Sequence, residues 1–113
     1  MNTANQKSLE EISFQIILHA GNARSSAMEA VQFAREGKFE DAKRKMEEAD
    51  QEFYHAHHFQ TNLLQKESSG ERVDPSILLI HAQDHLMTSM ATKDLVHEML
   101  FLHEKLQTRG ESL

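Results

Sequence analysis

The stretch "DPSILLIHAQDH" (residues 74–85) indicates how this chain folds. Asp74 before Pro75 is typical of a helix start, because a carboxylate caps the first turn and proline needs no hydrogen-bonded N–H at the first helical position. Four apolar residues follow, Ile77 to Ile80, and at about 100° per residue they spread over about 300° of a helix. Such a helix needs burial on more sides than one narrow core stripe provides.

The first part of the chain predicts a helix that opens at a capping box formed by Ser8 and Glu11. Apolar and small residues then recur at three- and four-residue spacing from Leu9 to Ala34, which is the period of a helix and not of a strand. Gly37 stands where the C-terminal cap of this helix belongs. Residues 1–7 are expected to be a frayed end.

A second helix is predicted from about Phe39 to about Lys66, followed by a polar loop over residues 67–73. The last helix then runs from Pro75 to about Gln107, with residues 108–113 as a second frayed end. Short connections between long helices make neighbours antiparallel. The sequence therefore predicts a single all-α domain, residues 1–113, folded as an antiparallel up-down-up three-helix bundle.

The composition excludes several classes of protein. The chain has 113 residues, enough for one domain, and a formal net charge of −6, which disfavours nucleic acid and anionic membrane surfaces as partners. It has no cysteine, so it can form neither a disulfide nor a thiolate metal site. The sequence shows no secretory leader pattern and no apolar run of about 20 residues, so we expect a cytoplasmic protein that does not insert into a membrane.

The surplus apolar surface of residues 77–80, together with a similar cluster at Phe14 and Ile16 to Leu18, needs something to cover it. A second copy of the same chain is the first choice, because closed symmetric homo-oligomers are the commonest assemblies. The alternative is a wide core stripe with some exposed aliphatic side chains, which are common on protein surfaces. The pattern favours self-association.

His81, Asp84 and His85 project from one side of the predicted helix, because residues three and four apart are helical neighbours. Three interpretations stay open. The two histidines can chelate a metal, with a further ligand from Asp84 or another helix. A neutral imidazole can instead attack an electrophile such as a phosphoryl group, since the histidine pKa lies near working pH. Thirdly, they can be ordinary surface or interface histidines of a helical adaptor.

The string "HAQDHLMTSM" (residues 81–90) resembles the IIA component of the lactose/cellobiose (N,N'-diacetylchitobiose) family of the bacterial phosphoenolpyruvate-dependent sugar phosphotransferase system. Three other strings agree with that family in order and spacing: "AGNARS" (20–25), "AHHFQTNLLQ" (56–65) and "LHEKL" (102–106). The resemblance covers nearly the whole chain. It implies a three-helix subunit that assembles into a homotrimer and acts as a phosphoryl carrier.

The same resemblance implies roles for single residues. His81, which matches the first histidine of H-A-Q-D-H, is the expected phosphorylation site. It would accept the group from the phosphohistidine of the carrier protein HPr and pass it to a cysteine of the IIB component. The membrane component IIC would then import and phosphorylate a β-linked disaccharide of the cellobiose, lactose or chitobiose class.

Four further residues receive expected roles around His81. His57, Gln83 and His85 are expected to support the active site, and Asp84 is expected at the trimer axis. The resemblance implies that three copies of Asp84 share a metal ion there, usually taken as magnesium. Three crowded carboxylates repel one another unless they are protonated or bridged by a cation, and a hard cation with oxygen ligands suits such a place better than zinc.

Overall fold

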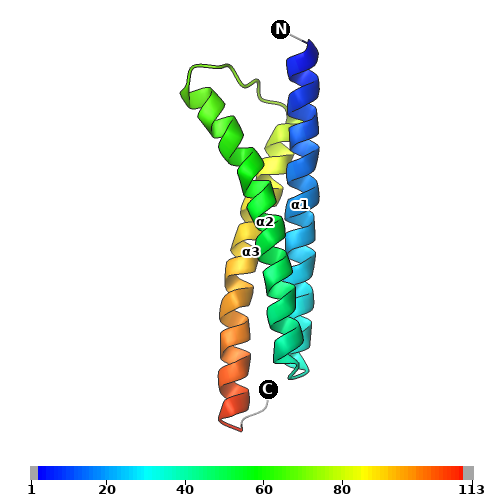
Figure 1. The fold of residues 1–113 in the computed structure, drawn as a ribbon, viewed down its shortest axis with the longest axis vertical. Coiled ribbons are helices and arrows are strands. Elements are labelled where there is room, and N and C mark those ends of the chain that lie inside the picture. The colour runs from blue at the N-terminus through cyan, green and yellow to red at the C-terminus, as the bar shows by residue number, and fades with distance from the viewer. Residues whose placement is uncertain (1–2, 111–113) are drawn as a thin grey trace.

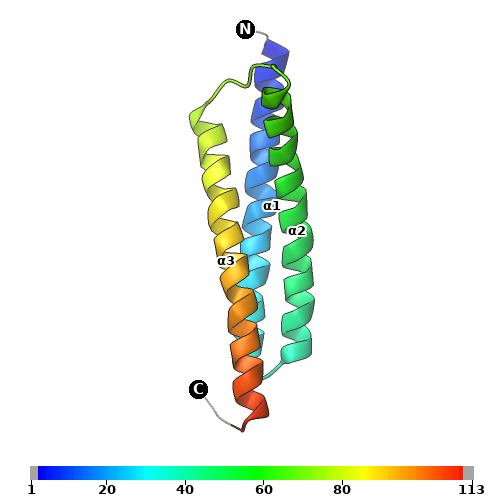
Figure 2. The same cartoon turned by 90° about the vertical axis from the view of Figure 1, so that its left-hand side faces the viewer.

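The computed structural model describes residues 3–110, and within them the chain forms three α-helices. These are α1 (Thr3–Arg35), α2 (Phe39–Ser68) and α3 (Ile77–Thr108), each antiparallel to the helix before it, in a rod of 62 × 20 × 19 Å (Figure 1). The second view shows the three helices side by side along most of their length (Figure 2). The predicted all-α antiparallel bundle is confirmed. None of the described helices is both long and apolar enough to cross a membrane.

The turn between α1 and α2 forms where the sequence predicts it, at Gly37. This residue has a φ of 77°, in the left-handed region that glycine enters without steric cost. Its N–H donates to the carbonyl of Ala34 at 3.0 Å, and the N–H of Lys38 donates to the carbonyl of Phe33 at 2.9 Å. These bonds satisfy carbonyls that the end of a helix leaves free, so α1 ends at Arg35 and α2 begins at Phe39.

The start of α3 differs from its prediction. The N-cap is Ser76 and not Asp74, because the Ser76 hydroxyl accepts a hydrogen bond from the N–H of Leu79 at 3.0 Å. Asp74 accepts instead from Nε of Arg72 at 2.5 Å, and Pro75 precedes the helix. Asp and Ser are about equally good N-caps, so the Asp-Pro signal could not decide between two caps that lie two residues apart.

The remaining boundaries also differ from the predicted ones. α1 begins at Thr3, so Ser8 lies within the helix and does not open it, and residues 3–7, predicted as frayed, are helical. α2 continues to Ser68, which shortens the predicted loop at its start. α3 includes Thr108, the first residue of the predicted second tail, and Arg109 and Gly110 form a turn after it. Residues 111–113 of that tail lie outside the described residues.

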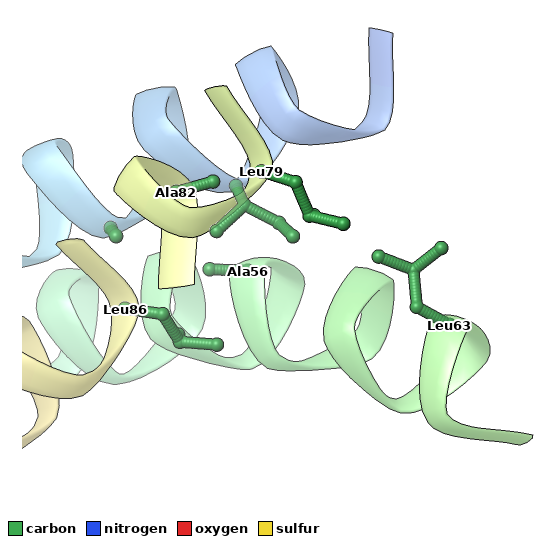
Figure 3. Packing of buried hydrophobic residues seen from close by; sticks show 7 residues of the cluster. Ala56, Leu63, Leu79, Ala82 and Leu86 are labelled. Carbon is green, nitrogen blue, oxygen red and sulfur yellow. The ribbon is translucent and has the colours of Figure 1, made fainter. Parts of the chain in front are cut away.

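The core is built on alanines, which let the helices approach closely. Figure 3 shows one part of it, where Ala56 and Leu63 of α2 face Ala82 and Leu86 of α3. α1 contacts both other helices more extensively than α2 contacts α3, and the last turns of α2 lean away from the bundle (Figure 1). The buried residues form two clusters: Ile16, Ala20, Ala56, Leu63, Leu79, Ala82 and Leu86, and further along Ala27, Ala30, Val31, Met46, Ala49 and Val96.

The surplus apolar surface of α3 lies on the outside of the bundle. Ile77 is 84% exposed and Leu95 is 60% exposed, although both are large aliphatic residues. With about 100° per residue, all the exposed large apolar residues of α3 except Phe101 fall on one face, opposite the buried one. We call this face the outer stripe of α3: Ile77, Ile80, Met87, Leu95, Met99 and Leu102.

The N-cap of α3 gives a direct test of the fold. Ser76→Ala removes the hydroxyl that accepts from Leu79 N–H, and we expect it to lower the free energy of unfolding by about 1 kcal/mol. Asp74→Ala loses only a pair with the exposed Arg72 and should cost about 0.3 kcal/mol. Urea denaturation at one fixed protein concentration measures both. The reverse order of the two losses would show that Asp74 is the cap.

Candidate functional site

The residues of the H-A-Q-D-H segment are distributed around α3, and the helix period decides where each one points. Ala82 and Leu86 are fully buried in the bundle. Asp84, about 200° from Ala82, is exposed and lies two turns after Ile77, in the outer stripe. His81 and His85 lie on one side of this stripe, and Gln83 lies on the other. The segment therefore presents different chemistry to each flank of the helix.

His81 and His85 form a contacting pair. Their ring centroids are 4.6 Å apart and their planes are nearly perpendicular, at 88°, so the edge of one imidazole meets the face of the other. His81 is exposed, whereas His85 is half-buried. The outer ring is thus open to another molecule, and the inner ring supports it from the bundle side.

The surroundings of His85 favour its neutral form. Burial lowers the pKa of His85 below its usual value, the charge on His81 and that on Arg24 of α1 lower it further, and Asp84 opposes them by raising it. A neutral imidazole keeps one N–H donor and one lone-pair acceptor. The remaining N–H of neutral His85 can donate a hydrogen bond to an anionic group at His81. The charge effect of Arg24 also shows that this flank of α3 faces α1.

Gln83 lies on the flank of α3 that faces α2. Its Oε1 accepts a hydrogen bond of 2.8 Å from Nε2 of Gln60 on α2. About 200° of helix separates Gln83 from His81, so the two side chains leave α3 in nearly opposite directions.

His57 belongs to the α2 side as well. Its ring stacks on Phe53 at 6.0 Å between centroids, and Nζ of Lys93 from α3 lies 4.9 Å from the centre of the Phe53 ring. The predicted site residues therefore form two groups within one chain. One group, His81 and His85, lies beside α1. The other consists of His57, which is exposed on α2 beside Phe53, and Gln83, which contacts Gln60 of α2.

Asp84 stands among apolar side chains at the surface. Asp84 is exposed. The Thr88 hydroxyl donates at 2.7 Å to the backbone carbonyl of Asp84 and not to its carboxylate. Among residues 3–110 no group of three or more His, Cys, Asp or Glu side chains comes together as a metal site. A cation at Asp84, or at His81 with His85, would need ligands from another copy of the chain or from solvent.

The other histidines of the "HAHH" tract point elsewhere. His55 lies 5.3 Å from the ring of His19 on α1, and His58 stacks on Tyr54 at 6.5 Å. His19 also bonds through Nδ1 to Glu52 at 2.6 Å, which ties α1 to α2. These contacts are structural and lie outside both groups of site residues.

Gln60 contacts the predicted site residue Gln83, and sequence reasoning did not single it out. A signal for it exists in the helix period: Gln60 falls on the same side of α2 as the buried residues Ala49, Ala56 and Leu63. A long polar residue at such a position needs a partner when it is partly buried. The sequence cannot name that partner, because Gln83 lies on another helix.

The chain is similar to several characterised proteins. It is 49% identical over 106 residues to the lichenan-specific phosphotransferase enzyme IIA component of Bacillus subtilis, covering 93% of this chain and 96% of the relative. The crystal structure of the cellobiose-specific enzyme IIA from Bacillus anthracis matches with a TM-score of 0.86 and 49% identity, over 96% of this chain and 94% of that one. The chitobiose-specific IIA in solution structures of its complex with HPr matches with a TM-score of 0.77 and 38% identity, over 88% and 96% of the two chains.

This chain thus shares its three-helix fold with sugar-specific IIA components of the phosphotransferase system. Residues 11–104 match the family described as "PTS system, Lactose/Cellobiose specific IIA subunit". The chain belongs to this family, as its sequence motifs predict. It is therefore a phosphoryl carrier of the phosphotransferase system.

The charge of Arg24 provides a test of the geometry around His85. Arg24→Gln removes a positive charge that opposes protonation, so we expect the pKa of His85 to rise. NMR titration of the imidazole resonances measures this change. Arg35→Gln, at the far end of the same helix, serves as the control and should leave His85 unaffected. An unchanged pKa in Arg24→Gln would show that α1 does not hold this charge near the histidine pair.

Proposed function

We propose that His81 is the residue that carries the phosphoryl group. The observation that supports this most strongly is the pairing of an exposed imidazole, His81, with a half-buried neutral one, His85, 4.6 Å away. A phosphoryl acceptor must be reachable in line by the side chain of a docked protein, and His81 meets this requirement. The neutral His85 can donate its N–H to a phosphoryl oxygen once the group arrives.

The proposed reaction consists of two exchanges of one phosphoryl group. A ring nitrogen of His81 attacks the phosphorus held by the phosphohistidine of HPr, forming a new N–P bond while the old one breaks. A cysteine thiolate of the IIB component then attacks the same phosphorus, forming an S–P bond and returning His81 to its neutral form. The sugar served belongs to the β-linked class of the relatives, which include lichenan-, cellobiose- and chitobiose-specific components.

We further propose that the chain works as a homotrimer joined along the outer stripe of α3. The stripe presents large apolar side chains over most of the helix, and such a surface is typical of an interface. Asp84 lies within the stripe, so a threefold axis along it would bring three carboxylates together. These residues would suit a hard divalent cation such as magnesium, which would offset the repulsion between the carboxylates.

This assembly would complete the site across two copies. When parallel α3 helices close a ring around their outer stripes, the α1 side of one helix faces the α2 side of the next. His81 and His85 of one copy would then face His57 and Gln83 of its neighbour. The two groups lie apart within one chain, which has no evident use in a monomer. In the trimer they would form the two walls of one phosphoryl site.

Phosphorylation of the purified protein tests the role of His81. After incubation with phosphoenolpyruvate, enzyme I and HPr, mass spectrometry should find one acid-labile phosphoryl group on His81. His81→Ala should accept none, a fall of at least about 1,000-fold in rate, because a covalent nucleophile has no substitute. His58→Ala, an exposed histidine outside the site, is the matched control and should react normally. Normal phosphorylation of His81→Ala would contradict the assignment.

The axial position of Asp84 is tested by its replacement with an apolar residue. Asp84→Leu should keep or strengthen the trimer, because it exchanges three crowded carboxylates for apolar side chains within an apolar stripe. Leu95→Glu introduces charge into the same stripe and should weaken the assembly. Sedimentation equilibrium measures both. Monomers of Asp84→Leu, under conditions where the unaltered chain is a trimer, would contradict this placement.

A further inference from the structure

The contact between Gln60 and Gln83 links α2 to α3 at the level of the histidine pair. Nε2 of Gln60 lies 2.8 Å from Oε1 of Gln83, and both side chains are half-buried. The other polar side-chain contacts between these helices, among the described residues, involve Asp50 and Lys43, which lie further along the rod. α2 leans away from the bundle beyond this point (Figure 1). Gln60 therefore makes the polar connection nearest to the site.

This hydrogen bond decides which end of the Gln83 amide is available. Oε1 is the only acceptor of that side chain, and it is directed at Gln60. The NH2 group, with its two donors, has no hydrogen-bond partner among the residues that the structure describes. A phosphoryl group in its ionised form offers only acceptor oxygens, so it can bind the NH2 end of an amide and is repelled by the carbonyl end.

We propose that Gln60 is a positioning residue for phosphoryl transfer, because it holds the Gln83 amide with its NH2 group directed outward. This inference rests on the proposed function, in which Gln83 forms part of one wall of the phosphoryl site of the neighbouring copy. Its NH2 group would there donate to the phosphoryl group on that copy's His81. Gln60 does not touch that group. It prevents the amide from rotating by half a turn, which would present a carbonyl oxygen to an anion. Partial burial helps, because water competes less for the amide there.

Replacement of Gln60 by glutamate tests this role with almost no change in shape. A carboxylate cannot donate to Oε1, but it accepts strongly from NH2, so Gln60→Glu turns the Gln83 amide around. The rate of transfer from phosphorylated HPr at saturating donor should fall about tenfold or more, with little change in KM. Gln60→Ala leaves the amide free to rotate and should slow transfer less. Gln51→Glu, an exposed residue of α2, controls for the added charge.

A double substitution separates positioning from a general structural effect. If Gln60 acts through Gln83, then Gln60→Ala should cause no further slowing in a Gln83→Ala background. Multiplying losses in the double variant, or transfer at the unaltered rate in Gln60→Glu, would overturn the role of Gln60 while leaving His81 as the carrier. A wild-type chain that takes no phosphoryl group would instead overturn the proposed function itself.

Discussion

The rest of the structure depends on one constraint: α3 is apolar on two opposite sides. Its inner side packs Ala82 and Leu86 into an alanine-rich bundle, where small side chains allow close approach to α1 and α2. Its outer side leaves Ile77 and Leu95 largely exposed. A helix buried on its inner side and apolar on its outer side has only two narrow flanks for polar chemistry. The predicted phosphoryl acceptor and its three predicted supporting residues lie at or beside these flanks: His81, His57, Gln83 and His85.

The two flanks of α3 carry different chemical groups. Beside α1, a half-buried His85 is kept neutral by desolvation and by the charges of His81 and Arg24, so it supports an exposed His81 without competing for a proton. Beside α2, Gln60 engages the oxygen of Gln83 and leaves donors free. A phosphoryl group needs both a nucleophile and donors for its oxygens. Within one chain these lie on separate surfaces, and the proposed ring of subunits would bring them together.

Much of this could be predicted from the sequence, and the exceptions have physical reasons. The helix period and Gly37 predicted the bundle, and the H-A-Q-D-H string led to the family that the comparisons confirm. The start of α3 was misplaced because two adequate caps lie close together, and Ser76 is used. The sequence did not predict that His57 and Gln83 lie on a different side of the bundle from His81. It depends on which helix packs on which flank of α3, and local spacing within one helix carries no information about that.

The central claim is that His81 of one copy works with the α2-side wall of its neighbour. Single-turnover transfer from phosphorylated HPr to mixed trimers tests it most directly. A chain without His81 (His81→Ala) and a chain without the Gln83 donor (Gln83→Ala) are unfolded and refolded together. The account predicts a new fast phase, absent from either variant alone, because some intact His81 side chains now face an intact Gln83. A mixture that shows only the sum of the two separate variants would contradict it.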